Sequence, residues 1–139
     1  MANELALRTI ASVPRPLPRE RMEAAIRAFQ ASYAIQDVET RVALFADNAV
    51  FEDPVGVPPI RGKAAIERFF RDTIASGIAI ALIPERIVFS GGEALCFTKA
   101  TFGFAGEEPS RVRLFQTFAF DADCLITSVR VYFDETCLL

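Results

Sequence analysis

The chain contains no histidine and no tryptophan among its 139 residues. Without histidine, the Ser-His-Asp and Cys-His catalytic arrangements cannot form in their usual versions. No histidine is available to hold a metal ion either. Acid–base chemistry must therefore use the side chains of Asp, Glu, Lys, Tyr or Cys.

Cysteine is also scarce, and its pattern excludes the common uses of the residue. The three cysteines, Cys96, Cys124 and Cys137, are odd in number, and no pair has the spacing of a metal site. We therefore expect free thiols. The net charge is −3 with no basic stripe, which argues against nucleic-acid binding. Neither a signal-peptide pattern nor an apolar run long enough for a membrane span is present, which predicts a cytoplasmic protein.

Hydrophobic residues, by contrast, are plentiful. They make up 52% of the chain and include 13 phenylalanines. This length fits one domain with a substantial core. Residues 14–18 read PRPLP, and three prolines in five positions disfavour a helix. We predict an extended arm over residues 1–18 and a single domain over residues 19–139.

Helical spacing of apolar residues dominates the first half of that domain. A helix beginning after Pro18 places four large side chains on one face: Met22, Ile26, Phe29 and Tyr33. Asp37 is a suitable N-cap for a second, short helix, which we expect to reach about Ala46. The segment KAAIERFFRDTIA, residues 63–75, predicts a third helix.

The second half has the features of strands. Four β-rich segments are separated by the turn-like stretches SGGE, GEEP and ADC, and they cover residues 82–89, 94–105, 110–121 and 125–134. Hairpins in series predict an antiparallel meander. A shorter strand, AVFED, ends immediately before Pro54. Helices followed by a sheet indicate the α+β class.

Two adjacent carboxylates, Glu52 and Asp53, end that short strand. Successive side chains of a strand point to opposite faces, so the two carboxylates should diverge and not share a proton. Asp53 should lie on the same face as Phe51, close to the rim of the core. Lost hydration beside phenylalanines would raise its pKa and make it a better base near neutral pH. The alternative is a solvated carboxylate in an Asp-Pro turn.

Gln116 is the one polar residue in an apolar row on its strand, shared with Val112, Leu114, Phe118 and Phe120. A buried amide needs hydrogen-bond partners. It is either a structural amide, bonded to neighbouring side chains, or a donor to the oxygen of a ligand. Tyr33 offers a second donor, or is a core tyrosine with its hydroxyl at the surface.

The stretch ALFADNAVFEDPVG, residues 43–56, resembles the ketosteroid isomerase branch of the nuclear transport factor 2-like (SnoaL-like) superfamily. RGKAAIERFF, LFQTFAFD and ITSVRVYF extend the likeness over most of the chain. The resemblance implies a cone-shaped, cystatin-like α+β fold, in which a curved antiparallel sheet wraps around N-terminal helices and encloses one deep apolar pocket. It also implies a homodimer formed through the sheets.

The resemblance also implies a chemistry. In these isomerases an aspartate before a proline moves a proton beside a ketone, while a tyrosine and a protonated aspartic acid hold the oxygen; ketosteroid isomerase is itself a well-known example of such pKa tuning. Asp53 matches the base. Phe29 stands at the position of the oxyanion tyrosine, and Phe70 stands at that of a second pocket tyrosine. Gln116 stands at the position of the protonated aspartate. This chain therefore has the base of these isomerases but different residues at their hydrogen-bond donor positions, so efficient ketosteroid isomerisation is not expected.

We therefore predict an isomerase- or lyase-type enzyme that needs no metal or organic cofactor and uses Asp53 as general base on an apolar carbonyl compound. The predicted pocket is lined by Phe29, Tyr33, Phe51, Phe69, Phe70, Gln116 and Phe118. One alternative is a non-catalytic ligand-binding domain, favoured by the apolar Phe29 and Phe70. Another places Arg130 and Asp134 in the pocket with Asp53, as in the epoxide hydrolases of the superfamily; a solvated or dimer-facing row is the simpler interpretation of these two residues.

Overall fold

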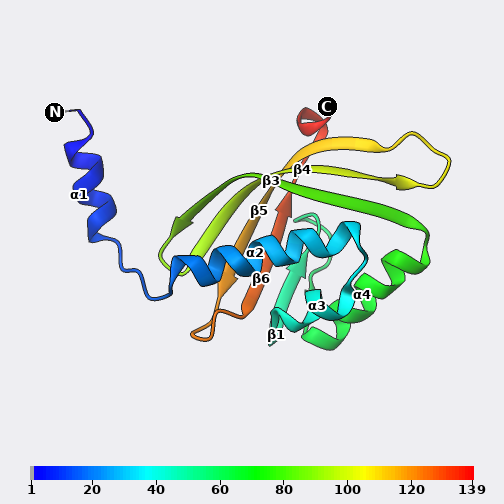
Figure 1. Cartoon of the computed structure of the whole chain (residues 1–139), viewed down its shortest axis with the longest axis horizontal. Helices are drawn as coiled ribbons and strands as arrows, with labels where there is room; N and C mark the ends of the chain where they lie inside the picture. Colours follow the sequence, from blue (N-terminus) through cyan, green and yellow to red (C-terminus); the bar gives the residue numbers. More distant parts are fainter. Residues whose placement is uncertain (1) are drawn as a thin grey trace.

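The computed structural model of the protein describes residues 2–139 and has the α+β architecture that the sequence predicts. Figure 1 shows the long helix α2 lying across one face of a curved sheet. In chain order the elements are α1 (Glu4–Ser12), α2 (Arg19–Ala34), α3 (Val38–Ala43), β1 (Phe45–Glu52), β2 (Ile60–Arg61), α4 (Lys63–Ala75), β3 (Ile78–Ser90), β4 (Glu93–Phe104), β5 (Ser110–Phe120), β6 (Ile126–Tyr132) and the short 3-10 helix η1 (Glu135–Cys137).

The sheet has six strands in the order β2-β1-β6-β5-β4-β3. The meander β3-β4-β5-β6 is antiparallel throughout, as predicted. β1, however, runs parallel to β6, with Phe51 opposite Val129. The expectation of a wholly antiparallel sheet is therefore wrong at this pairing. No hairpin connects these two strands, so no local turn sets their relative direction.

The concave side of the sheet and the helices enclose a core rich in phenylalanine. Met22, Ile26 and Phe29 of α2 are buried against it, which confirms the predicted apolar face of that helix. The largest fully buried side chains include five phenylalanines: Phe29, Phe45, Phe51, Phe70 and Phe118. The rings of this cluster meet mainly edge to face or tilted, the arrangement that aromatic quadrupoles favour.

The short helix α3 begins as predicted, because the Asp37 carboxylate accepts a hydrogen bond from the backbone N–H of Thr40 at 3.1 Å. It ends at Ala43, earlier than the expected Ala46. The carbonyl of Leu44 instead accepts a hydrogen bond from Ile126 N–H at 2.8 Å. Strand pairing with β6 therefore takes over from the helix at this point.

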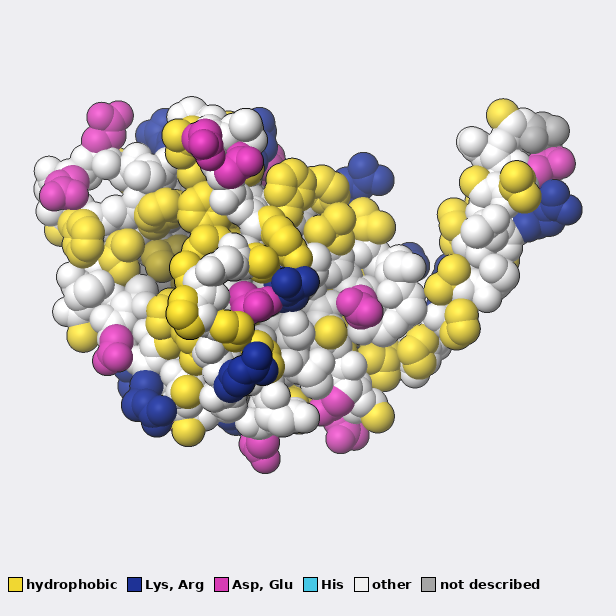
Figure 2. All heavy atoms as spheres, turned by 180° about the vertical axis from the view of Figure 1, so that it is seen from behind, with side chains coloured by type: hydrophobic (Ala, Val, Ile, Leu, Met, Phe, Trp, Pro, Cys, Tyr) yellow, Lys and Arg dark blue, Asp and Glu magenta, His cyan; other side chains and the backbone are white. Residues whose placement is uncertain are grey.

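The N-terminal arm differs from the expectation of an extended segment. Residues Glu4–Ser12 form α1, and only the proline-containing stretch after it is non-helical. The prolines begin at Pro14, so they cannot disturb the earlier residues, whose Glu, Leu and Ala favour a helix. No residue of α1 is buried. Figures 1 and 2 show this helix projecting away from the domain.

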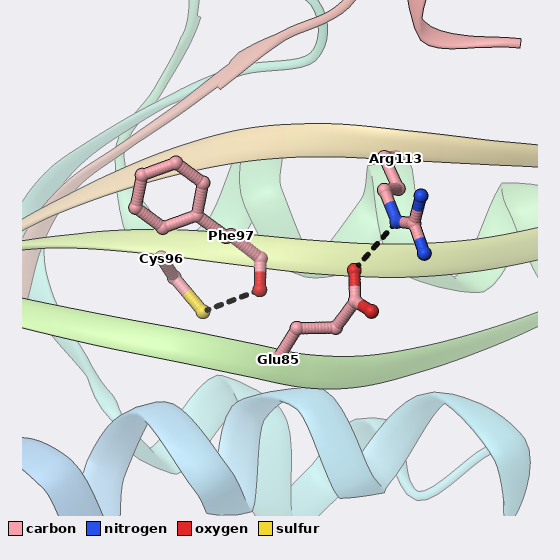
Figure 3. A network of polar contacts seen from close by, with 4 residues as sticks. All are labelled: Glu85, Cys96, Phe97 and Arg113. Atoms are coloured by element: carbon pink, nitrogen blue, oxygen red, sulfur yellow. Dashed lines mark hydrogen bonds and ion pairs between the residues drawn. The ribbon is translucent and has the colours of Figure 1, made fainter.

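The outer face of the sheet combines charged and apolar side chains, and Figure 2, which views the molecule from behind, shows hydrophobic side chains gathered around a few charged ones. On this face Glu85 of β3 pairs with Arg113 of β5 across β4, with an N–O distance of 3.0 Å (Figure 3). The rings of Phe97 and Phe115 meet at 5.2 Å between their centroids.

All three cysteines are free thiols, as predicted. Within residues 2–139, no helix has the length and apolar character needed to cross a membrane.

Candidate functional site

Two adjoining compartments lie between α2, α4 and the concave face of the sheet. A small compartment of about 50 Å³ and a larger one of about 220 Å³ share four lining residues: Tyr33, Asp53, Ile78 and Ile80. The larger compartment is otherwise mostly apolar and contains Gln116 in its wall. Asp53 and Gln116 therefore line the same space. A concave, mainly apolar space with a few polar groups is typical of small-molecule sites.

Asp53 enters this cavity because it follows β1 on the side of the buried Phe51. Glu52 lies on the opposite face, where it forms an ion pair with Arg130. The two carboxylates thus diverge, as strand alternation predicts. Asp53 is exposed at the rim, but the protein around it removes part of its hydration and raises the pKa of its carboxyl. Within residues 2–139, Asp53 has no ion-pair or side-chain hydrogen-bond partner, and its peptide bond to Pro54 is cis.

Tyr33 of α2 lines both compartments. Its hydroxyl has no hydrogen-bond partner among the described residues. Burial raises the pKa of Tyr33 far above its usual value, the Arg41 charge opposes this shift, and the Asp53 charge adds to it. The hydroxyl therefore keeps its proton at neutral pH and can donate it in a hydrogen bond.

Gln116 is 3% exposed, and the partners of its side-chain oxygen are on two different elements. Its Oε1 accepts hydrogen bonds from Gln30 Nε2 at 2.8 Å and from Thr98 Oγ1 at 3.2 Å. Its Nε2 donates to no residue within 2–139, and that atom is not sealed from solvent. Because Gln30 and Thr98 already donate to the oxygen, the NH2 group is the part of the Gln116 amide available to a ligand.

Gln30 is a member of this polar network that the sequence analysis did not identify. It is buried on α2, also donates to Thr98 Oγ1 at 2.9 Å, and its Nε2 lies 3.3 Å from the sulfur of Cys96. Its own Oε1 is buried without a partner among the described residues. The available signal was its position four residues after Ile26, on the edge of the apolar face.

Arg41 is the second residue that the sequence analysis missed. It is 2% exposed and lines the small compartment. Its guanidinium carbon lies 3.6 Å from the ring centroid of Tyr33 and 4.6 Å from that of Phe70. Its Nε and Nη2 donate to the side-chain and backbone oxygens of Ser32 at 2.8 and 3.2 Å. The signal was a charged residue three positions after the buried Val38, on the inner face of α3.

The predicted pocket phenylalanines divide into two groups. Phe69 and Phe70 line the small compartment. Phe29, Phe51 and Phe118 line neither compartment, and the structure places them in the core behind the wall. Their rings pack against one another, with 5.5 Å between the centroids of Phe29 and Phe118, so their neighbours cover the surfaces that a ligand would need.

The Asp–Arg–Asp arrangement does not form. Arg130 is on the outer face with Glu52, and Asp134 accepts a hydrogen bond from the backbone N–H of Thr136 at 2.9 Å. The other face of this segment supplies Val131 and Phe133 to the wall of the larger compartment. Among residues 2–139, no three His, Cys, Asp or Glu side chains gather into a candidate metal site.

The pattern of the SnoaL-like domain family matches residues 26–129, which is most of the chain. The chain belongs to the SnoaL-like domain family. A steroid delta-isomerase from Nocardioides simplex is 38% identical to this SnoaL-like domain over 90 residues, which cover 65% of this chain and 71% of the relative.

Solved structures with a similar fold also include an isomerase. A Δ5-3-ketosteroid isomerase from Mycobacterium sp. superimposes on this SnoaL-like domain with a TM-score of 0.75 and 26% identity, covering 86% of this chain and 97% of the other. A computationally designed 17-OHP binder superimposes with a TM-score of 0.76, 26% identity and the same two coverages. The chain is therefore similar both to isomerases and to a ligand-binding protein.

Proposed function

We propose that this protein is a cofactor-independent proton-transfer enzyme that acts on an apolar carbonyl compound, with Asp53 as general base. One observation carries the proposal. A carboxylate with a raised pKa, the Tyr33 hydroxyl and the Gln116 amide nitrogen belong to residues lining one apolar cavity, and none of these groups has a partner within residues 2–139. Polar groups left free in an apolar cavity are available to a ligand.

In the proposed reaction Asp53 removes a proton from the carbon next to the carbonyl. The electron pair of the broken C–H bond moves into a C–C double bond, and negative charge develops on the oxygen. The Gln116 NH2 or the Tyr33 hydroxyl donates a hydrogen bond to this oxygen. The protonated Asp53 then returns its proton to another carbon, which yields an isomer and restores the carboxylate. Fixed donors in a mainly apolar site favour such charge more than bulk water would.

The similarities support an isomerase-type reaction, since one relative is a steroid delta-isomerase and one structural neighbour is a ketosteroid isomerase. The hydrogen-bond donors of this cavity, Gln116 and Tyr33, support a substrate preference different from that of the isomerases. An amide is a weaker donor than a carboxylic acid, but it donates at any pH. Gln116 therefore suits a carbonyl that is polarised during the reaction better than one that becomes a full oxyanion.

Hydrogen–deuterium exchange at the carbon next to the carbonyl of small cyclic ketones tests the role of Gln116. We expect Gln116→Met to slow enzyme-catalysed exchange by about a hundredfold, the lower end of the usual cost of losing one preorganised donor, because Tyr33 remains. Proton NMR in deuterated buffer measures the rate. Thr117→Val, on the same strand but the opposite face, is the matched control. An unchanged rate for Gln116→Met would remove Gln116 from the mechanism, and no exchange by the wild type would favour a non-catalytic binding domain.

We also propose a homodimer that forms through the outer face of the sheet. Val88, Phe115 and Tyr132 are 39%, 38% and 38% exposed, although each is large and apolar or aromatic. Exposed apolar surface of this kind is typical of interfaces. Light scattering should give a dimer mass for the wild type and a monomer mass for Phe115→Glu, whose charge would be buried in the interface. A monomer mass for the wild type contradicts this assembly.

A further inference from the structure

Arg41 carries a buried positive charge that forms no ion pair with any residue of the described chain. Within residues 2–139, the arginines that form ion pairs are at the surface, paired as Arg27–Glu23, Arg71–Glu67, Arg113–Glu85 and Arg130–Glu52. The Asp37 carboxylate favours the Arg41 charge electrostatically but forms no ion pair with it. Burying a cation without a direct ion-pair partner is unfavourable unless other groups compensate for its lost hydration. Arg41 is therefore a candidate for pairing with an anion from outside the chain.

The contacts of Arg41 leave one edge of its guanidinium free. Of the five N–H groups of an arginine, the one on Nε and one on Nη2 are used by Ser32. The guanidinium carbon lies over the rings of Tyr33 and Phe70, which provide no hydrogen-bond acceptor for the remaining N–H groups. What remains is the outer edge, with both hydrogens of Nη1 and the second hydrogen of Nη2. That edge matches the two oxygens of a carboxylate in a bidentate pair.

The small compartment sets the size of the anion. Its volume of about 50 Å³ has room for a group of a few heavy atoms, and it adjoins the larger, mostly apolar compartment at Tyr33 and Asp53, which line both. A ligand that fills both would place a compact polar group against Arg41 and an apolar body beside Gln116. The nearby Asp53 repels an anion, and the Arg41 charge offsets this repulsion.

We infer that the cavity binds an apolar carboxylic acid, whose carboxylate pairs with the free edge of Arg41 in the small compartment while its body lies in the larger one. If the proposed function also holds, the substrate is an apolar carbonyl compound that carries a carboxylate. The acid-binding part of the inference depends on Arg41 and not on catalysis by Asp53.

Titration calorimetry at pH 7 with 2-naphthoate and 2-naphthamide tests the inference, because the two probes have nearly the same shape and differ in charge. We expect the wild type to bind the naphthoate at least about tenfold more tightly than the amide, a ratio that corresponds to about 1.4 kcal/mol. Arg41→Met should abolish this preference and leave the affinity for the amide nearly unchanged. Arg27→Met, which removes an exposed arginine from the neighbouring helix, should keep the preference.

Equal affinity of the wild type for the two probes would overturn the inference without any variant. A preference that persists in Arg41→Met would overturn the assignment to Arg41. If Arg41→Met fails to fold, Arg41→Lys provides the second test, since it keeps the charge and loses the planar fork. We expect it to reduce the preference severalfold, and an unchanged preference would overturn the bidentate pair.

Asp53→Asn separates this inference from the proposed function. This variant should bind 2-naphthoate at least as tightly as the wild type, because a repelling charge is lost, although its catalysis of exchange should be strongly reduced. Acid binding that depends on Arg41, together with no exchange by the wild type, would reject the proposed function alone. Exchange that depends on Asp53, without any preference for the acid, would reject the acid-binding inference alone.

Discussion

Asp53→Asn is expected to slow hydrogen exchange at the carbon next to a bound carbonyl by about 10² to 10⁴-fold, the usual contribution of a positioned general base. Asparagine has the shape of aspartate, so the cavity and its wall should remain intact. It cannot accept the proton, however, so the C–H bond must be broken by water or not at all. Proton NMR of a ketone in deuterated buffer measures the rate directly.

Glu52→Gln is the matched control for this experiment. It makes the same chemical change one residue earlier in the chain, but on the outer face, where the carboxylate pairs with Arg130. We expect exchange within about twofold of the wild type, because a surface ion pair contributes little to the fold. If both variants exchange at the wild-type rate, Asp53 is not the base. If both are equally slow, the loss comes from the strand and not from the carboxylate.

The raised pKa of Asp53 gives this prediction a pH dependence. The base acts when it is unprotonated, so catalysed exchange in the wild type should fall as pH decreases through the folded-state pKa. The effect on stability has the opposite sign. The folded state holds the Asp53 proton more tightly than the unfolded chain, so protonation of Asp53 stabilises the fold. This stabilisation is complete below the unfolded pKa of about 3.9 and is lost as pH rises through the folded-state pKa.

Asp53→Asn should accordingly raise the urea midpoint at pH 7 relative to the wild type, and this gain should disappear near pH 3. The carboxyl is at an exposed rim, where solvent screens part of the effect, so we expect a small change. A gain of equal size at both pH values would show that it comes from some other difference between the two side chains.

Helices with a clear apolar stripe could be predicted closely from the sequence, whereas features set by distant contacts could not. The third predicted helix, residues 63–75, has the bounds of α4, because both its periodicity and the flanking Gly62 are local. The start of β1 at Phe45 and its parallel pairing with β6 depend on Ile126 and Val129, about 80 residues away in the chain. No pattern around Phe45 contains that information.

The same division applies to the site. Strand alternation separated Asp53 from Glu52, and the apolar row around Gln116 marked it as unusual, since both arguments need only neighbouring residues. Arg41 and Gln30 were missed because tertiary contacts bury them. Gln30 meets Thr98 across 68 residues of chain, and the face of Arg41 is covered by Tyr33. A polar residue on the inner face of a helix is the local sign that could have indicated both.

Phe29→Ala is expected to lower the free energy of unfolding by about 3 to 5 kcal/mol, the usual cost of truncating a fully buried phenylalanine. Phe29 is 0% exposed. Its ring contacts Tyr33, Phe45 and Phe118, at centroid distances of 5.3, 6.0 and 5.5 Å. These neighbours come from three different elements, so the cavity left by the ring cannot close without moving the sheet against α2.

Urea unfolding at fixed protein concentration and 25 °C measures this loss, with Phe104→Ala as the control. Phe104 is 47% exposed at the end of β4, so the same truncation there should cost less than about 1 kcal/mol. Similar losses for the two variants would contradict a core centred on Phe29. Because Tyr33 contacts both Phe29 and Arg41, the ring at position 29 supports the wall of the ligand site through Tyr33. A milder variant, Phe29→Leu, should therefore change the free energy of ligand binding by less than it lowers the free energy of unfolding.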